Sequence, residues 1–332
     1  MRILTVTMLL ILAGSWRISA ATDSWALIEG ASRIALATPE RGRALLGERD
    51  EFIRALSAFD RSARIKREGA ITETEFLEFV AGQVREWTAA DTSVLEPAIQ
   101  RVQGHLAGWR LALPETVWLI KTTGKEEGDA AYTRGNAVIL PVAKLSESAR
   151  QLERLLLHEL FHVLSRHQPQ LRDRMYGIVG FRRVGAVKLP QIWEDRRITN
   201  PDAPIIEHAI TVKRDDRHFT AMPFLYSREP EYRSVDRRSF FAFLEFRLLE
   251  IAEERDGWKP ALRKGEPVLH APDSVSGFFE QIGRNTSYII HPEEVLADNF
   301  ALLMLGESDL PSPAVVSSLK ALLMELSAPS RD

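Results

Sequence analysis

Residues 155–164 constrain the fold of this chain most, because the run is apolar nearly all round yet carries three ionisable side chains. Seven of its ten residues are leucine, phenylalanine or valine, the composition of a helix that is buried on every side. The ionisable residues are His158, Glu159 and His162. Burying such groups without partners is costly. The folded protein must therefore supply partners for them in its interior.

A bound metal ion would satisfy these groups. His158 and His162 are four residues apart, so a helix places both imidazoles on one face, about 6 Å apart. Two imidazoles at that spacing can bind one zinc ion. Glu159 is turned by about 100° from His158 and leans over the open coordination position, where it can accept a proton from water acidified by zinc. The pattern matches a zinc protease signature. The alternative, an amphipathic helix with two chance histidines, leaves the burial cost unexplained.

We expect the third ligand far downstream, where Pro292 is suited to start a helix with His291 near its N-cap. Glu294 and Asp298, four residues apart, then share one face of that helix. Glu294 is the expected third ligand, and Asp298 accepts a hydrogen bond from the outer nitrogen of a ligand histidine. The alternative for Glu293 and Glu294 is ordinary acidic enrichment of a first helical turn.

Other sources of a third ligand fit less well. One class of zinc proteases uses a histidine ten residues after the first, following a glycine turn, but Gln168 and Ser165 occupy those positions here. Glu194 and Asp195, or Glu250 and Glu254, could supply the third ligand instead. Neither pair offers both a ligand and a second carboxylate to support a ligand histidine.

These motifs give the chain a resemblance to the gluzincin class of zinc metallopeptidases, including its prenyl-protease-like and thermolysin-like branches. That class pairs an HExxH helix with a later helix bearing Glu-x-x-x-Asp, often with alanine before the aspartate, and residues 294–298 have that form. The resemblance implies that His158, His162 and Glu294 bind one zinc ion (Zn²⁺). It also implies that Glu159 is the general base and that Asp298 supports a ligand. It covers residues 117–167 and 287–305, with 131 residues between His162 and Glu294.

The class also binds extended substrate along an edge strand that precedes the first motif helix. Asn136 and Ala137 stand in that place. A zinc hydrolase further needs a group that stabilises the oxyanion. Tyr288 and His291, just before the Glu294 helix, are the first candidates, and the others are His208, His218 and His270.

The expected fold class is helix-rich α+β, with a zincin-like core in which a short sheet packs on the HExxH helix beside a second, ligand-bearing helix. Residues 22–114 are expected to form a helical region, and residues 115–332 a zincin-like domain with a long insertion at about 169–272. Apolar runs predict a buried strand at 117–120, and at 131–141 either a hairpin or a single strand with a glycine bend. The motif helix is expected over 146–167, with Ser146 as its N-cap.

The N-terminus has the layout of a secretory signal, with a basic start, an apolar run over residues 3–14 and small residues before cleavage at about residue 21. The alternative is an uncleaved N-terminal anchor. Because no second long apolar run follows, we expect a secreted or periplasmic chain with no membrane span after cleavage. The net charge of −3 gives no reason to expect nucleic acid as a partner, and the absence of cysteine excludes disulfides and thiolate ligands.

The expected function is that of a zinc-dependent peptidase acting on a peptide or protein substrate. Water activated by the metal attacks the peptide bond, and Glu159 acts as general base. Two alternatives stay open: a zinc amide hydrolase of the cell envelope that is not a peptidase, and a catalytically silent protein that binds zinc for structure. Glu159 has no role in the second alternative.

Overall fold

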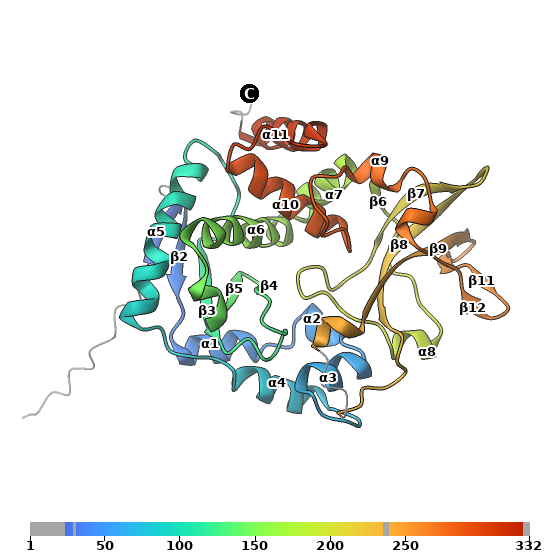
Figure 1. Ribbon diagram of the computed structural model, residues 1–332, viewed down its shortest axis with the longest axis horizontal. Helices are drawn as coiled ribbons and strands as arrows, with labels where there is room; N and C mark the ends of the chain where they lie inside the picture. Colours follow the sequence, from blue (N-terminus) through green and yellow to red (C-terminus); the bar gives the residue numbers. More distant parts are fainter. Residues whose placement is uncertain (1–23, 29–30, 235–238, 328–332) are drawn as a thin grey trace, which may run out of the picture.

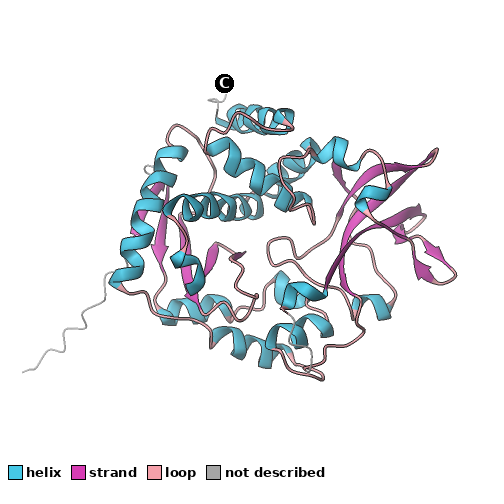
Figure 2. Cartoon of the chain, viewed as in Figure 1, coloured by secondary structure: helices cyan, strands magenta, loops and turns pink. Residues whose placement is uncertain are grey.

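The computed structural model describes residues 24–28, 31–234 and 239–327. The expected signal peptide, residues 1–21, lies outside them. The described chain is mixed α+β, with helices gathered around a first sheet and a second sheet on the opposite side of the molecule (Figures 1 and 2). None of the described helices is both long and apolar enough to cross a bilayer.

The first sheet has five strands in the order β1-β2-β3-β5-β4. They are β1 (Ser24–Ile28), β2 (Ser32–Leu36), β3 (Thr116–Thr122), β4 (Tyr132–Arg134) and β5 (Ala137–Pro141). The central strands β2, β3 and β5 are parallel, while β1 and β4 are the antiparallel edges. The predicted buried strand and hairpin are thus confirmed as β3 and β4–β5. Gly135, with φ of 55°, makes the tight turn of that hairpin.

The expectation of a purely helical region over residues 22–114 is wrong at its start. β1 and β2 lie there, and β2 pairs with β3, so this region and the one that follows share a sheet. Residues 39–65 form three short helices, because Asp50 and Ser57 each cap a new helix. The helices of the region are α1 (Pro39–Leu46), α2 (Glu51–Ala55), α3 (Ala58–Ile65), α4 (Glu73–Ala81) and α5 (Ala89–Leu106).

The motif helix is α6 (Ala149–His167), and it begins three residues later than predicted. Ser146 ends the 3₁₀ turn η1 (Val142–Ser146), and Ser148 is the N-cap. The Ser148 hydroxyl accepts from the Gln151 N–H while the Gln151 side chain accepts from the Ser148 N–H, which makes a capping box. α6 packs against α5 and the first sheet in the main hydrophobic core.

The insertion after α6 carries the second sheet, whose main path is β10-β9-β8-β7-β6 and which is antiparallel throughout. Its strands are β6 (Phe181–Arg183), β7 (His208–Arg214), β8 (Arg217–Ser227), β9 (Leu244–Glu254), β10 (Gly257–Pro260) and β13 (Leu269–His270), which pairs with β9. The smaller elements are α7 (Pro169–Ile178), α8 (Gln191–Glu194), η2 (Phe240–Phe243), β11 (Leu262–Arg263), β12 (Glu266–Pro267), η3 (Pro272–Ser274) and α9 (Phe278–Ile282).

The chain ends in two helices, α10 (Pro292–Met304) and α11 (Pro313–Ser327). The predicted helix that starts at Pro292 is confirmed as α10. It runs beside α6, and the ring of Phe300 lies 5.6 Å from that of Phe161 in the interface (Figure 1). This packing brings together two segments that are distant in sequence, each with its ionisable residues.

Candidate metal centre

The two motif histidines lie on the face of α6 that meets α10. Their ring centroids are 4.7 Å apart, and His162 is fully buried. The leucines and Phe161 on the other faces of α6 fill the core, which fixes the rotation of the helix. The histidines are therefore held against α10.

α10 supplies a carboxylate between the two imidazoles. The Glu294 Oε2 atom lies 3.2 Å from Nε2 of His158 and 3.5 Å from Nε2 of His162. The candidate ligand atoms of the three residues all lie within 4.8 Å of one another. The structure thus brings the three predicted ligands together, with both Nε2 atoms turned to one carboxylate oxygen.

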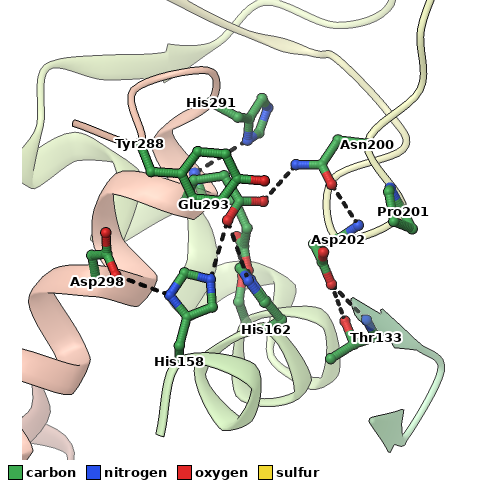
Figure 3. A network of polar contacts seen from close by, with 12 residues as sticks. Thr133, His158, His162, Asn200, Pro201, Asp202, Tyr288, His291, Glu293 and Asp298 are labelled. Atoms are coloured by element: carbon green, nitrogen blue, oxygen red, sulfur yellow. Dashed lines mark hydrogen bonds and ion pairs between the residues drawn. The ribbon is translucent and has the colours of Figure 1, made fainter. Parts of the chain in front are cut away.

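Each imidazole is also held from behind by a carboxylate of α10 (Figure 3). Asp298 Oδ1 lies 3.2 Å from Nδ1 of His158, and Glu293 Oε1 lies 3.0 Å from Nδ1 of His162. A carboxylate at Nδ1 fixes the tautomer that leaves Nε2 free to bind a metal. Asp298 was predicted in this position, and its support of His158 agrees with that expectation.

Glu293 is the supporting residue that the sequence interpretation missed. It is only 2% exposed, and it accepts hydrogen bonds from the Ser165 hydroxyl (2.7 Å) and the Tyr176 hydroxyl (2.5 Å) besides facing His162. The signal was present, because most residues after Glu294 in this helix are apolar, with Asp298 and Asn299 as the exceptions. A helix of that kind buries its first turn too, so an acid there needs internal partners.

The electrostatics of the cluster favour positive charge. Burial opposes protonation of His158, but hydrogen bonds to Asp298 and Glu294 outweigh it and raise its pKa to about 9. The pKa of Glu294 is held well below its usual range, because the two histidines overcome the effect of burial. The site therefore holds a carboxylate that attracts a cation into a buried place.

Two of the buried polar atoms that lack a hydrogen-bond partner among the described residues belong to the motif residues of α6: Nε2 of His162 and Oε2 of Glu159. A native interior seldom leaves such atoms unsatisfied. A cation held by both histidines and Glu294 would satisfy the first, and a water molecule on that cation the second. Two nitrogens and one oxygen are a ligand set that zinc accepts in catalytic sites. The residues present therefore fit a zinc ion.

Glu159 lies on the neighbouring side of α6 and is 3% exposed. Burial, followed by the negative charge of Asp202, raises the pKa of its carboxyl group above the usual range. Candidate ligand atoms of Glu159, His162 and Asp202 also lie within 4.8 Å of one another. Asp202, which comes from the loop between α8 and β7, was not expected at the site.

The two candidates for oxyanion stabilisation have different environments. The ring of Tyr288 stacks over His158 at 6.3 Å between centroids, and the residue is 41% exposed. His291 is buried at the N-cap of α10, where its Nδ1 accepts from the Glu293 N–H, and it packs on Tyr176. Figure 3 shows the His291 ring directed away from the ligand histidines. Only Tyr288 therefore borders the cluster.

The predicted substrate strand is wrong in its position. β5, which contains Ala137, pairs with β3 on one side and β4 on the other, so it is internal to the sheet. The Asn136 amide is likewise occupied, since it donates to the Thr116 carbonyl. The three-residue strand β4 forms the edge instead, because the first strand of the hairpin lies on the outer side of β5. Thr133 of this edge strand donates its N–H to Asp202.

The remaining candidates lie in other networks. Glu250 binds Arg217 and His270, and His208 pairs with Asp173. The two metal-type clusters found among the described residues contain none of the remaining alternatives, which are Glu194, Asp195, Glu250, Glu254, His208, His218 and His270.

No protein-family model matches this chain, and neither curated proteins nor solved structures include a significant match. Function must therefore be inferred from the chemistry of the site itself.

Proposed function

We propose that this protein is a zinc-dependent hydrolase of peptide bonds, built on a zincin-like core. The observation that carries the proposal is the convergence of two Nε2 atoms, from His158 and His162, on one oxygen of Glu294, with the His162 nitrogen otherwise unsatisfied. His158, His162 and Glu294 would hold one zinc ion. When bound, zinc would lower the pKa of water toward neutrality and polarise a carbonyl group.

Glu159 is the general base of the proposed reaction. Its carboxylate is buried beside the cluster, has an unsatisfied oxygen, and binds no ligand histidine through a described hydrogen bond. It would accept a proton from the attacking water and then deliver it to the leaving amine. A raised pKa suits a group that must both take and return a proton near neutral pH.

A site of purely structural zinc has four protein ligands and no base. Among the described residues, the group that contains both motif histidines has one further candidate ligand, Glu294, and Glu159 lies beside this group. This favours catalysis over a structural role.

A hollow with aromatic and polar walls borders the cluster and supports a peptide as substrate. Tyr288, Phe240 and Phe241 lie in its wall together with Asn200 and Asp202. Its aromatic rings could contact side chains of a peptide whose backbone crosses the proposed metal centre. Because residues 1–21 have the layout of a secretory signal, we also propose that this reaction takes place outside the cytoplasm.

The test is to measure zinc content and cleavage of a peptide library with the wild-type protein and Glu159→Gln. We expect about one zinc per chain in both proteins, because Glu159 is not a ligand. We expect turnover to fall by about 100- to 10,000-fold in the variant, the usual effect of removing a general base. Loss of zinc from Glu159→Gln, or full activity in it, would contradict the assignment.

A further inference from the structure

A loop of the insertion covers part of the metal centre. This site loop, residues 199–203, connects α8 to β7 and crosses the centre on the His162 side, while Tyr288 covers the His158 side (Figure 3). The Asn200 amide donates to Oε1 of Glu294 at 2.5 Å. The loop thus touches the proposed third ligand directly.

Asp202 binds the exposed edge of the first sheet. Its Oδ1 accepts from the Thr133 N–H at 2.7 Å and from the Thr133 hydroxyl at 2.6 Å. Thr133 is the middle residue of the edge strand β4, and this N–H points away from β5. An outward N–H on an edge strand is the group that an added peptide strand would bind through its carbonyl oxygen.

Asp202 also lies beside the proposed general base and one proposed ligand, since its carboxylate is within 4.8 Å of candidate ligand atoms of both Glu159 and His162. One loop side chain therefore occupies the edge-strand donor and the space beside the general base together. An extended substrate would have to pass through both places.

Several contacts hold the loop in this position. At its start, the Thr199 carbonyl accepts from Arg64 at 2.7 Å. At its end, the Arg166 guanidinium donates to the Pro201 carbonyl (3.3 Å) and the Asp202 carbonyl (3.2 Å). Within it, the Asp202 N–H donates to Oδ1 of Asn200 at 3.0 Å. The closed position is thus a specific, bonded conformation.

We propose that the site loop stands in the place of the substrate backbone, with Asp202 on the Thr133 N–H, and that peptide binds only after the loop moves away. This inference rests on the proposed zinc hydrolase function. The substrate class that it implies is an extended peptide that adds to β4. Peptide and loop then compete, so the apparent affinity for peptide is reduced by the fraction of protein that is open.

The test measures binding of a peptide hydroxamate, a zinc-directed peptide analogue, to the zinc-loaded full chain. Asp202→Ala removes the bonds to Thr133 and should tighten binding about tenfold, the shift expected from losing a hydrogen bond to a charged group. Thr133→Val keeps the edge N–H but loses the hydroxyl bonds to Asp202 and Arg166, and should tighten binding about threefold. Asp195→Ala, which removes an exposed carboxylate from the same insertion, should change nothing.

Amide hydrogen exchange gives a second readout. The Thr133 amide should exchange slowly in the wild type, faster in Asp202→Ala, and slowly again when that variant binds the peptide hydroxamate. Unchanged or weaker hydroxamate binding by Asp202→Ala and Thr133→Val, at one zinc per chain, would overturn the loop proposal and leave the hydrolase proposal standing. A wild-type chain without zinc would overturn both.

Discussion

At the scale of single residues, the two imidazoles of the candidate centre have carboxylates on both sides. Glu294 faces their Nε2 atoms, while Asp298 and Glu293 face the Nδ1 atoms of His158 and His162. A carboxylate at Nδ1 raises the basicity of the imidazole and fixes its ring. The metal affinity of the site should therefore depend on residues that never touch the metal.

Glu293→Gln tests this dependence. Glutamine keeps the size of the side chain but removes the charge beside His162. We expect zinc affinity to fall by about 10- to 100-fold, the usual effect of losing such a support. Competition with a chromophoric chelator measures it, and Glu307→Gln, at an exposed acid just past α10, is the control. Equal affinity in Glu293→Gln and the control would show that Glu293 does not support the ligand.

His291 predicts a pH dependence of stability. Burial lowers its pKa from 6.5 to about 4. Between these values the unfolded chain binds more protons than the folded one, so the stability contributed by neutral His291 is complete above pH 6.5 and is lost as the pH falls toward 4. As the pH falls through that window, we expect protonation of His291 to lower the unfolding free energy of the metal-free protein by about 1.4 kcal/mol per pH unit.

The comparison is with His291→Asn, which retains an N-cap acceptor for the Glu293 N–H but does not titrate. Urea unfolding between pH 7 and 4.5, with a chelator present, should give a shallower pH dependence in the variant. An identical slope in both proteins would mean that His291 is not buried in its neutral form.

At the scale of elements, the site depends on the packing of α6 against α10. Phe161 and Phe300 meet in that interface and are both almost fully buried. Phe300→Ala should lower the unfolding free energy by about 3–5 kcal/mol, because it leaves a cavity in the core. Zinc affinity should fall with it, since α10 carries Glu294.

Chemical denaturation measures the first effect and chelator competition the second. Phe241→Ala, at a ring that is 43% exposed, should change stability by only about 0.5 kcal/mol and is the matched control. A stable Phe300→Ala protein with unaltered zinc affinity would show that this packing does not position the ligand.

The sequence was sufficient to predict these two helices, because their periodic apolar residues and ionisable positions are local signals. Pro292 starts α10 as expected. The start of α6 was misplaced because both Ser146 and Ser148 can cap a helix, and only the second has a glutamine three residues later to complete the capping box. Local sequence patterns were thus enough to predict the two helices, while the exact start of α6 depends on the paired hydrogen bonds between Ser148 and Gln151.

At the scale of the whole molecule, the features that escaped prediction depend on contacts between distant segments. The place of β2 beside β3 and of β4 at the edge follows from sheet pairing that no local pattern encodes. Asn200 and Asp202 reach the centre from an insertion with no recognisable motif. Both matter for the proposed activity, since they decide what lies on the substrate side of the site.

The proposed metal centre requires Glu294 and the two histidines to bind one cation together. The most direct measurement is calorimetric zinc titration of the metal-free wild type, His162→Ala and Glu294→Ala, with thermal unfolding of each protein with and without zinc. We predict one zinc site per wild-type chain. At a free zinc concentration 1,000 times the dissociation constant, zinc should raise the unfolding free energy by about 4 kcal/mol. The binding and the stabilisation should both be lost in the two variants. Unchanged zinc affinity in Glu294→Ala would contradict the proposed centre.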